Sequence, residues 1–169
     1  MSSSEARSRR AVVAGVAGLL AAGLGGCGFA LRGMPPLRFS SIALTGFAAH
    51  SPMLHELQRR LEQQLNVLAT PDRADVVLQA LVDARERSIV ASTSAAQVRE
   101  VQLRLRFSFR AQTPSGRELI PRAELLMARD LSFQESAALA KEYEEAELFS
   151  DMQDEMVVQV LRRLAAVQV

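Results

Sequence analysis

The sequence has few of the residue types on which catalysis, metal binding and disulfide cross-linking depend. Its 169 residues include one cysteine, two histidines, one tyrosine and no tryptophan. A single cysteine excludes a disulfide within the chain. His50 and His55 have no cysteine or carboxylate at metal-ligand spacing apart from Glu56, and no nucleophile-elbow or phosphate-loop motif occurs. The sequence therefore predicts a protein that is not an enzyme and holds no metal or other cofactor.

The first 26 residues have the layout of a secretory signal peptide. Three arginines within the first ten residues precede an uncharged apolar run from Ala11 to Leu24, after which Gly25-Gly26-Cys27 follows. As a helix this run would span about 21 Å, short of the ~30 Å hydrocarbon core, so a permanent membrane span is disfavoured. Residues 1–26 are therefore predicted to be removed.

The junction Leu24-Gly25-Gly26-Cys27 resembles the lipobox of bacterial lipoproteins, in which the chain is cut before the cysteine and the thiol receives a diacylglyceryl group. The alternative is an ordinary signal peptide followed by a stray cysteine. Two or more acyl chains anchor a protein firmly, since each buried methylene contributes ~0.8 kcal/mol. Cys27 is thus the predicted lipid anchor. By resemblance to the sorting rule of Gram-negative lipoproteins, Gly28 indicates the periplasmic side of the outer membrane.

Beyond the predicted cleavage site the chain divides into a short tether and one domain. Residues 27–38 hold Gly33, Pro35 and Pro36 without periodicity, which predicts an extended tether. The length of residues 39–169 suits one domain with one hydrophobic core. Basic and acidic residues nearly balance after residue 26, so bulk charge does not predict a nucleic-acid partner.

The first half of this domain is predicted to be a strand, a helix and a second strand. Residues 40–45 form a short strand, and Ser51-Pro52 is an N-cap followed by proline at the first helical position. Helical spacing then continues through Leu54, Leu57, Leu61, Leu65 and Leu68. From residue 76 period two predicts a strand, one face of which carries Val76, Leu78, Ala80, Val82 and Ala84.

The second half is predicted to be two further strands and a long helix. The clearest amphipathic strand has an apolar side of Val101, Leu103, Leu105, Phe107 and Phe109. Turn chemistry at residues 113–116 predicts a hairpin to a strand marked by Leu125, Met127, Leu131 and Phe133. From Ala137 a helix is predicted by the apolar stripe of Phe149, Met152, Met156, Val160, Leu164 and Val167.

The order β-α-β-β-β-α predicts an α+β domain with two helices packed on one face of a mainly antiparallel four-stranded sheet. The other sheet face would be polar and rich in arginine. Four glutamates in the first turns of the last helix could be imagined as a cation site. A solvated helix face near the positive end of the helix dipole is the preferred interpretation of Glu142, Glu144, Glu145 and Glu147.

Two stretches resemble the LptE family of lipopolysaccharide-assembly lipoproteins. Residues 27–33, Cys-Gly-Phe-Ala-Leu-Arg-Gly, are similar to the family's mature N-terminus. Residues 138–142, Ala-Leu-Ala-Lys-Glu, are similar to the entry into its last helix, and Met156 and Leu161-Arg162-Arg163-Leu164 follow at family-like distance. The resemblance implies a protein without enzymatic activity that sits in the lumen of the β-barrel LptD, helps that barrel assemble, and binds lipopolysaccharide destined for the outer leaflet.

The resemblance also points to candidate lipopolysaccharide-binding residues. Lipopolysaccharide carries phosphates near its lipid, and arginine binds phosphate bidentately, so Arg104, Arg106 and Arg110 are candidates. Lys141, the only lysine, stands in the family motif. A solvated sheet face is the alternative interpretation of the arginines. Family members tend to carry a basic residue in the loop after the first long strand, but none occurs here before Arg99.

Two other functions compete with this one. Another envelope lipoprotein, such as an auxiliary subunit of a phospholipid-transport system, would share the anchor and the fold class but would lack a partner of the LptD kind. A lipid-anchored hydrolase would need a base and a nucleophile in one pocket, and the sequence offers no such pair.

The substitution Cys27→Ala should release the chain from the outer membrane without unfolding it, because the predicted core lies elsewhere. Envelope fractionation with immunoblotting measures the first effect, and circular dichroism of the released chain measures the second. A variant that still fractionated with the outer membrane would contradict the assignment of Cys27 as the anchor.

Overall fold

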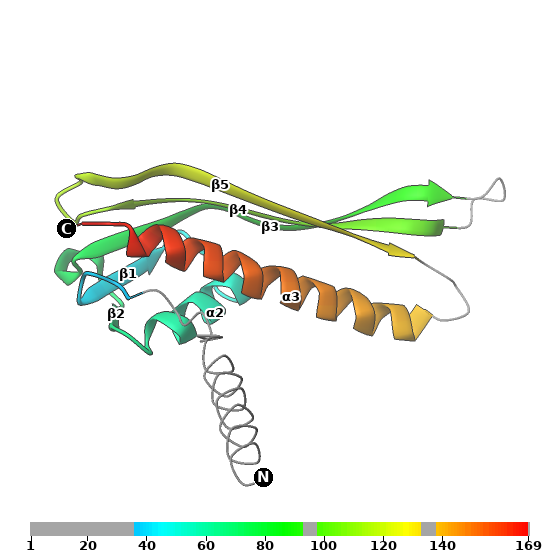
Figure 1. Cartoon of the computed structure of the whole chain (residues 1–169), viewed down its shortest axis with the longest axis horizontal. Coiled ribbons are helices and arrows are strands. Elements are labelled where there is room, and N and C mark those ends of the chain that lie inside the picture. Colours follow the sequence, from blue (N-terminus) through cyan, green and yellow to red (C-terminus); the bar gives the residue numbers. More distant parts are fainter. Residues whose placement is uncertain (1–35, 93–97, 133–137, 169) are drawn as a thin grey trace, which may run out of the picture. The chain divides into compact units, whose positions relative to one another are not determined.

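A five-stranded sheet with two helices against one of its faces makes up the described part of the chain (Figure 1). This computed structural model describes residues 36–92, 98–132 and 138–168. In chain order they form β1 (Ser41–Thr45), α2 (Pro52–Leu61), β2 (Asn66–Leu68), the 3-10 turn η1 (Pro71–Arg73), β3 (Val76–Ser92), β4 (Val98–Gln112), β5 (Glu118–Ser132) and α3 (Ala138–Ala165). The predicted signal peptide, Cys27, the motif at residues 27–33 and Phe133 lie outside these ranges. Neither described helix is long and apolar enough to cross a bilayer.

The sheet is mixed and has the strand order β2-β1-β3-β4-β5. The predicted α+β class with two helices is therefore confirmed, but the predicted number of four strands is wrong. β1 pairs in parallel with β2 and with β3, whereas the pairs β3–β4 and β4–β5 are antiparallel. The long strands β3, β4 and β5 pair antiparallel toward one edge of the sheet. The short strands β1 and β2 pair in parallel toward the other edge.

The missed strand, β2, lies where the first helix was predicted to continue. α2 ends at Leu61, and Val67 pairs with Ile42 of β1 instead of adding a helical turn. Leu65 is buried, as the leucine spacing predicted, but it packs from the connection between α2 and β2. Leucines spaced three or four residues apart do not by themselves distinguish a helix from a turn followed by a strand. Here the pairing with β1 favours the strand.

The N-terminus of α2 forms as its sequence predicts. The Ser51 side chain accepts a hydrogen bond from the backbone N–H of Leu54 at 3.0 Å, and Pro52 occupies the first helical position. The buried face of the helix consists of Met53, Leu57 and Leu61. Leu54, predicted on the apolar stripe, is only half-buried.

The hydrophobic core lies between α3 and the covered face of the sheet. The apolar side chains of β4, at the centre of the long strands, are almost completely buried, as the alternation predicted. Every residue of the predicted stripe of α3 is also buried, together with Val157 and Leu161. Burying one side chain of this size contributes ~1.5–3 kcal/mol. The packing of α2 and α3 against the covered face of the sheet is therefore the main source of stability.

A β-bulge at Leu81 corrects the predicted face of β3. Ala80 lies opposite Phe109 and Val82 lies opposite Ser108, so one extra residue stands in β3 at this point. The extra residue moves the side chains that follow to the other face. Val82 and Ala84, predicted to lie on the core face, therefore lie on the opposite one.

Charged residues of β3 consequently face the helices beyond the bulge. Asp83 accepts a hydrogen bond from the Ser51 hydroxyl. The Arg85 guanidinium donates to the side chain of Gln153 on α3 and lies 5.2 Å from the ring centroid of Phe149. These polar contacts replace apolar packing at this end of the covered face, where buried polar groups need partners.

Gly46, just after β1, allows the chain to turn away from β3. Its φ is +79°, and a Cβ placed there would lie 2.3 Å from the carbonyl oxygen of Ala80. We expect Gly46→Ala to reduce the free energy of unfolding by more than about 2 kcal/mol, because it adds a clash with backbone to the strain of the left-handed conformation.

Gly116→Ala is the matched control for this measurement by denaturant unfolding. Gly116 has a φ of +89°, but nothing lies within 4 Å of its Cβ position. This variant should lose only about 1 kcal/mol through backbone strain. Equal losses in the two variants would show that the close approach of Gly46 to β3 is unimportant.

Candidate functional site

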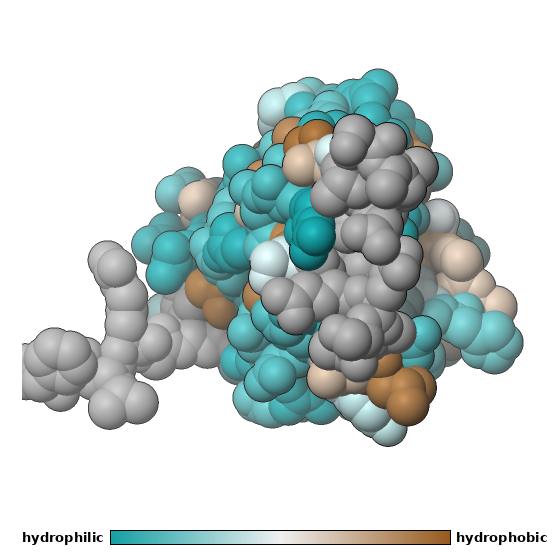
Figure 2. Space-filling view, turned by 90° about the vertical axis from the view of Figure 1, so that its right-hand side faces the viewer, coloured by the Kyte–Doolittle hydropathy of each residue, from teal (hydrophilic) through white to brown (hydrophobic). Residues whose placement is uncertain are grey.

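The sheet face turned away from α2 and α3, the open face, gathers exposed polar side chains from the three long strands. The strand register places together Ala84, Glu86 and Ser88 of β3, Gln102, Arg104, Arg106 and Arg110 of β4, and Glu124, Leu126, Ala128 and Asp130 of β5. Figure 2 views the sheet from the end at which α3 begins, and its upper part, over the strands, is mostly hydrophilic. The predicted arginine-rich face is thus confirmed.

Each predicted arginine of this face has a polar neighbour. Arg104 donates from Nε to Gln102 Oε1 at 2.7 Å, and Arg110 donates from Nε to Gln79 Oε1 at 2.8 Å. Arg106 Nη2 lies 3.2 Å from Glu86 Oε1, in an ion pair between two half-exposed side chains. Because a guanidinium carries five N–H donors, these contacts leave donors on each arginine for an anionic group.

An exposed leucine stands directly opposite one of these arginines. Leu126 of β5 pairs with Arg106 of β4, and its side chain is 63% exposed. A cation beside an apolar side chain suits an amphiphile with an anionic head. Leu126 was not predicted as a candidate because the apolar residues on either side, Leu125 and Met127, indicated the core face of β5. A large apolar residue out of phase with the alternation was the signal that could have revealed it.

Lys141, the fourth candidate, is not brought together with the arginines. It lies in the first turn of α3, which covers the opposite face of the sheet. Its ammonium forms an ion pair with Glu144 at 2.7 Å, and only 16% of its side chain is exposed. The candidates therefore form two groups, with three arginines on the open face and one lysine at the start of α3.

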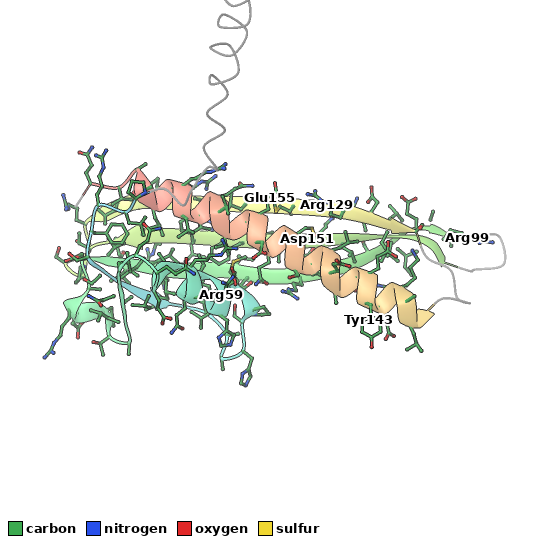
Figure 3. All side chains as sticks on the ribbon, turned by 60° about the horizontal axis from the view of Figure 1, so that its bottom comes forward. Arg59, Arg99, Arg129, Tyr143, Asp151 and Glu155 are labelled. Atoms are coloured by element: carbon green, nitrogen blue, oxygen red, sulfur yellow. The ribbon has the colours of Figure 1, made fainter. Side chains whose placement is uncertain are left out.

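Ion pairs hold α3 to the strands on both sides of β4. Arg87 of β3 pairs with Glu145 at 3.1 Å, and Arg129 of β5 pairs with Glu155 at 3.1 Å. Figure 3 shows Arg129 and Glu155 together along β5. Glu144 and Glu145, predicted to lie on a solvated helix face, thus form ion pairs with Lys141 and Arg87.

The shifted pKa values belong to structural contacts elsewhere. Burial of Glu56 opposes its ionisation, but hydrogen bonds and charges from Arg59 and Arg60 keep the pKa of this carboxyl below its ordinary value. Backbone hydrogen bonds from Ser40 and Ser41 lower the pKa of Asp75. Among the described residues no group of three or more histidine, cysteine or acidic side chains could hold a metal ion.

Comparison with known proteins identifies one matching family model. The model described as LptE, lipopolysaccharide-assembly, matches residues 39–164, from just before β1 to the last turn of α3. No curated protein matches the sequence.

Solved structures with this fold include three bacterial lipoproteins. The solution structure of uncharacterised lipoprotein B from Nitrosomonas europaea is 30% identical, with a TM-score of 0.70 over 82% of this chain and 91% of that one. A minor lipoprotein from Acinetobacter baumannii is 20% identical, with a TM-score of 0.62 over 78% of this chain and 94% of that one. Rare lipoprotein B from Shewanella oneidensis is 21% identical, with a TM-score of 0.57 over 74% and 90%. The last two show the fold alone.

Replacing Arg104, Arg106 or Arg110 singly by alanine should change the free energy of unfolding by less than about 1 kcal/mol, because exposed polar contacts contribute little. Leu103→Asp on the same strand is the contrast, since burying an unpaired charge in the core should cost several kcal/mol. Thermal unfolding of the four variants measures both effects. An arginine variant as unstable as Leu103→Asp would mean that the open face is needed for folding.

Proposed function

The chain belongs to the LptE family of lipopolysaccharide-assembly proteins, and from this premise we propose that it is an outer-membrane lipoprotein that binds lipopolysaccharide and forms a complex with a β-barrel of the LptD kind. The family match over residues 39–164 carries the proposal, because it includes every described strand and nearly all of α3. Cys27 anchors the chain by lipid at the periplasmic side of the outer membrane. The protein is not an enzyme: it acts by binding.

The open face supports the lipopolysaccharide half of this proposal. Successive outward residues of a strand lie about 6.8 Å apart, so Arg104, Arg106 and Arg110 form a row that can contact several anionic groups. Guanidinium forks suit phosphate and carboxylate. Leu126 beside Arg106 offers an apolar contact for the lipid. A polar face also suits a plug inside a barrel, because the lumen of a large outer-membrane barrel is polar.

Lys141 forms a second contact for the same ligand, at the start of α3. Its stem is largely covered while its ammonium is held by the more exposed Glu144. A phosphate of lipopolysaccharide would compete with Glu144 for the ammonium. The two groups of cations face different sides of the sheet, so we propose that they contact different lipopolysaccharide molecules or different stages of its passage.

The alternative function is that of an auxiliary subunit of a phospholipid-transport system. The protein that the chain binds distinguishes this alternative from the proposed function. Mild detergent extraction of outer membranes, capture of a C-terminally tagged chain and mass spectrometry should recover a stoichiometric large β-barrel. Recovery of a phospholipid-transport complex without such a barrel would favour the alternative.

The triple variant R104A/R106A/R110A should bind purified lipopolysaccharide at least about tenfold more weakly than the unmodified chain, since charge-assisted hydrogen bonds contribute ~1.5–3 kcal/mol each. Lys141→Ala should reduce binding independently. The matched control, R59A/R73A/R162A, removes the same charge from exposed positions on α2, η1 and α3. Titration of labelled lipopolysaccharide measures binding, and equal losses in the two triple variants would assign the effect to net charge rather than to the open face.

A further inference from the structure

The outer edge of β5 is not paired with any described strand. β5 is the last strand of the sheet, and only β4 lies beside it. From Ala123 to Ser132 it pairs with β4 without interruption, so this part of the strand is regular. Backbone N–H and C=O groups that point away from β4 can therefore pair with another strand. Nine residues of such an edge span about 27 Å, which exceeds the length of a typical strand.

Arg122 lies at the start of this edge, on the open face. It is exposed and forms no hydrogen bond or ion pair with any described residue. The register shift between Phe109 and Ala111 leaves Arg110 of β4 across from it. Arg122 therefore lies beside a cation of its own chain, and no anion in the described part of the chain is paired with it.

Asp130 carries the opposite charge near the other end of the edge. Arg122, Leu126 and Asp130 share one face, because alternate residues of a strand point to the same side and Leu126 lies midway between the other two. Asp130 is exposed and accepts one hydrogen bond from the Gln102 side chain at 2.9 Å. The Gln102 amide is neutral, so the carboxylate keeps its charge and further acceptor positions.

We propose that β5 pairs with β5 of a second copy of this chain, in an antiparallel dimer whose two-fold axis passes beside Leu126. The two five-stranded sheets would then join edge to edge. The two exposed leucines would meet at the axis, and Arg122 of each copy would lie opposite Asp130 of the other. Apolar pairs and pairs of opposite charge stabilise strands when they lie directly opposite each other.

Neighbouring registers are less favourable. A two-fold axis at Met127 would place Glu124 opposite Asp130, and like charges directly opposite are destabilising. An axis at Leu125 would place Glu124 opposite Leu126 and would pair no opposite charges. Of these three registers, the one about Leu126 therefore fits the charges best.

The covered face of β5 fits the same register. Arg129 stays in its ion pair with Glu155 of α3 and would lie opposite Ala123 of the second copy, whose small side chain leaves room for it. Leu125 would lie opposite Met127 of the second copy. A two-fold axis perpendicular to the sheet keeps the two open faces on the same side, so their arginine rows would form one continuous surface.

The inference goes beyond the proposed function, which assigns a barrel and lipopolysaccharide as partners but no self-association. Pairing would cover Leu126, the residue proposed to contact the lipid. Paired chains are therefore chains that hold no lipopolysaccharide. A test on the chain free of lipopolysaccharide and of other proteins can fail without affecting the proposed function.

Disulfide cross-linking of the full processed chain, purified in mild detergent, tests the proposal. Directly opposite residues have Cβ atoms about 4.5–5.5 Å apart, so Leu126→Cys should give a cross-linked dimer under mild oxidation. Ser88→Cys is the matched control, since it lies exposed on the open face of β3, away from this edge. The unmodified chain, whose only cysteine is Cys27, is the blank.

Charge exchange in the Leu126→Cys chain tests the register. Arg122→Asp or Asp130→Arg alone should reduce the cross-linked fraction at least about fivefold, because each places two pairs of like charges across the axis. The double variant R122D/D130R restores both pairs with reversed polarity and should recover the cross-linking. Sedimentation velocity of the unmodified chain should show a dimer that dissociates on dilution.

Other results would overturn the inference. Equal cross-linking at Ser88 and Leu126 would indicate random collision. Failure of the double variant to recover cross-linking would reject the pairing of Arg122 with Asp130. A single-copy mass at every concentration would reject self-association, and species larger than a dimer would indicate head-to-tail pairing of β5 with β2 instead of a two-fold contact.

Discussion

The structure depends on the apolar packing of α2 and α3 against the covered face of the sheet, with β4 at the centre of its three long strands. The apolar stripe of α3 from Phe149 to Leu164 and Val167 just after the helix are buried, and β4 supplies aromatic and aliphatic side chains to the same core. Because the core lies on one side of the sheet, the other side is free to be polar. The arginines of β4 occupy that side by the same alternation that buries Phe107 and Phe109. Stability thus depends on one face of β4, and the proposed lipopolysaccharide contacts lie on its other face.

The bulge at Leu81 changes this division of roles on β3. Before it, β3 contributes Val76, Leu78 and Ala80 to the core, and after it, the same face carries charged residues that bind α2 and α3. The part of the sheet that follows the bulge is therefore held to α3 partly by ion pairs and hydrogen bonds. Those contacts are weaker and more dependent on salt than the apolar core.

The sequence predicted what short-range patterns determine. The alternation of Leu103 and Arg104 fixed which side of β4 is buried, and the spacing from Phe149 to Val167 fixed the buried stripe of α3. The predictions from sequence were wrong where pairing with residues distant in the chain determines the local structure. A three-residue strand at Val67 forms only because β1 lies beside it, and the bulge at Leu81 is visible only in the pairing with β4. The arginine row could be predicted, but the separation of Lys141 from it follows from the path of α3 across the sheet.

The proposed role of this chain in lipopolysaccharide assembly can be tested in living cells. Its most direct test is depletion of the chain in the cells that make it, with lipopolysaccharide accessible on the surface of intact cells measured through time. Surface lipopolysaccharide should fall as the chain is lost, and the unmodified chain should restore it. Unchanged surface lipopolysaccharide together with altered phospholipid distribution would contradict this role and favour a role in phospholipid transport.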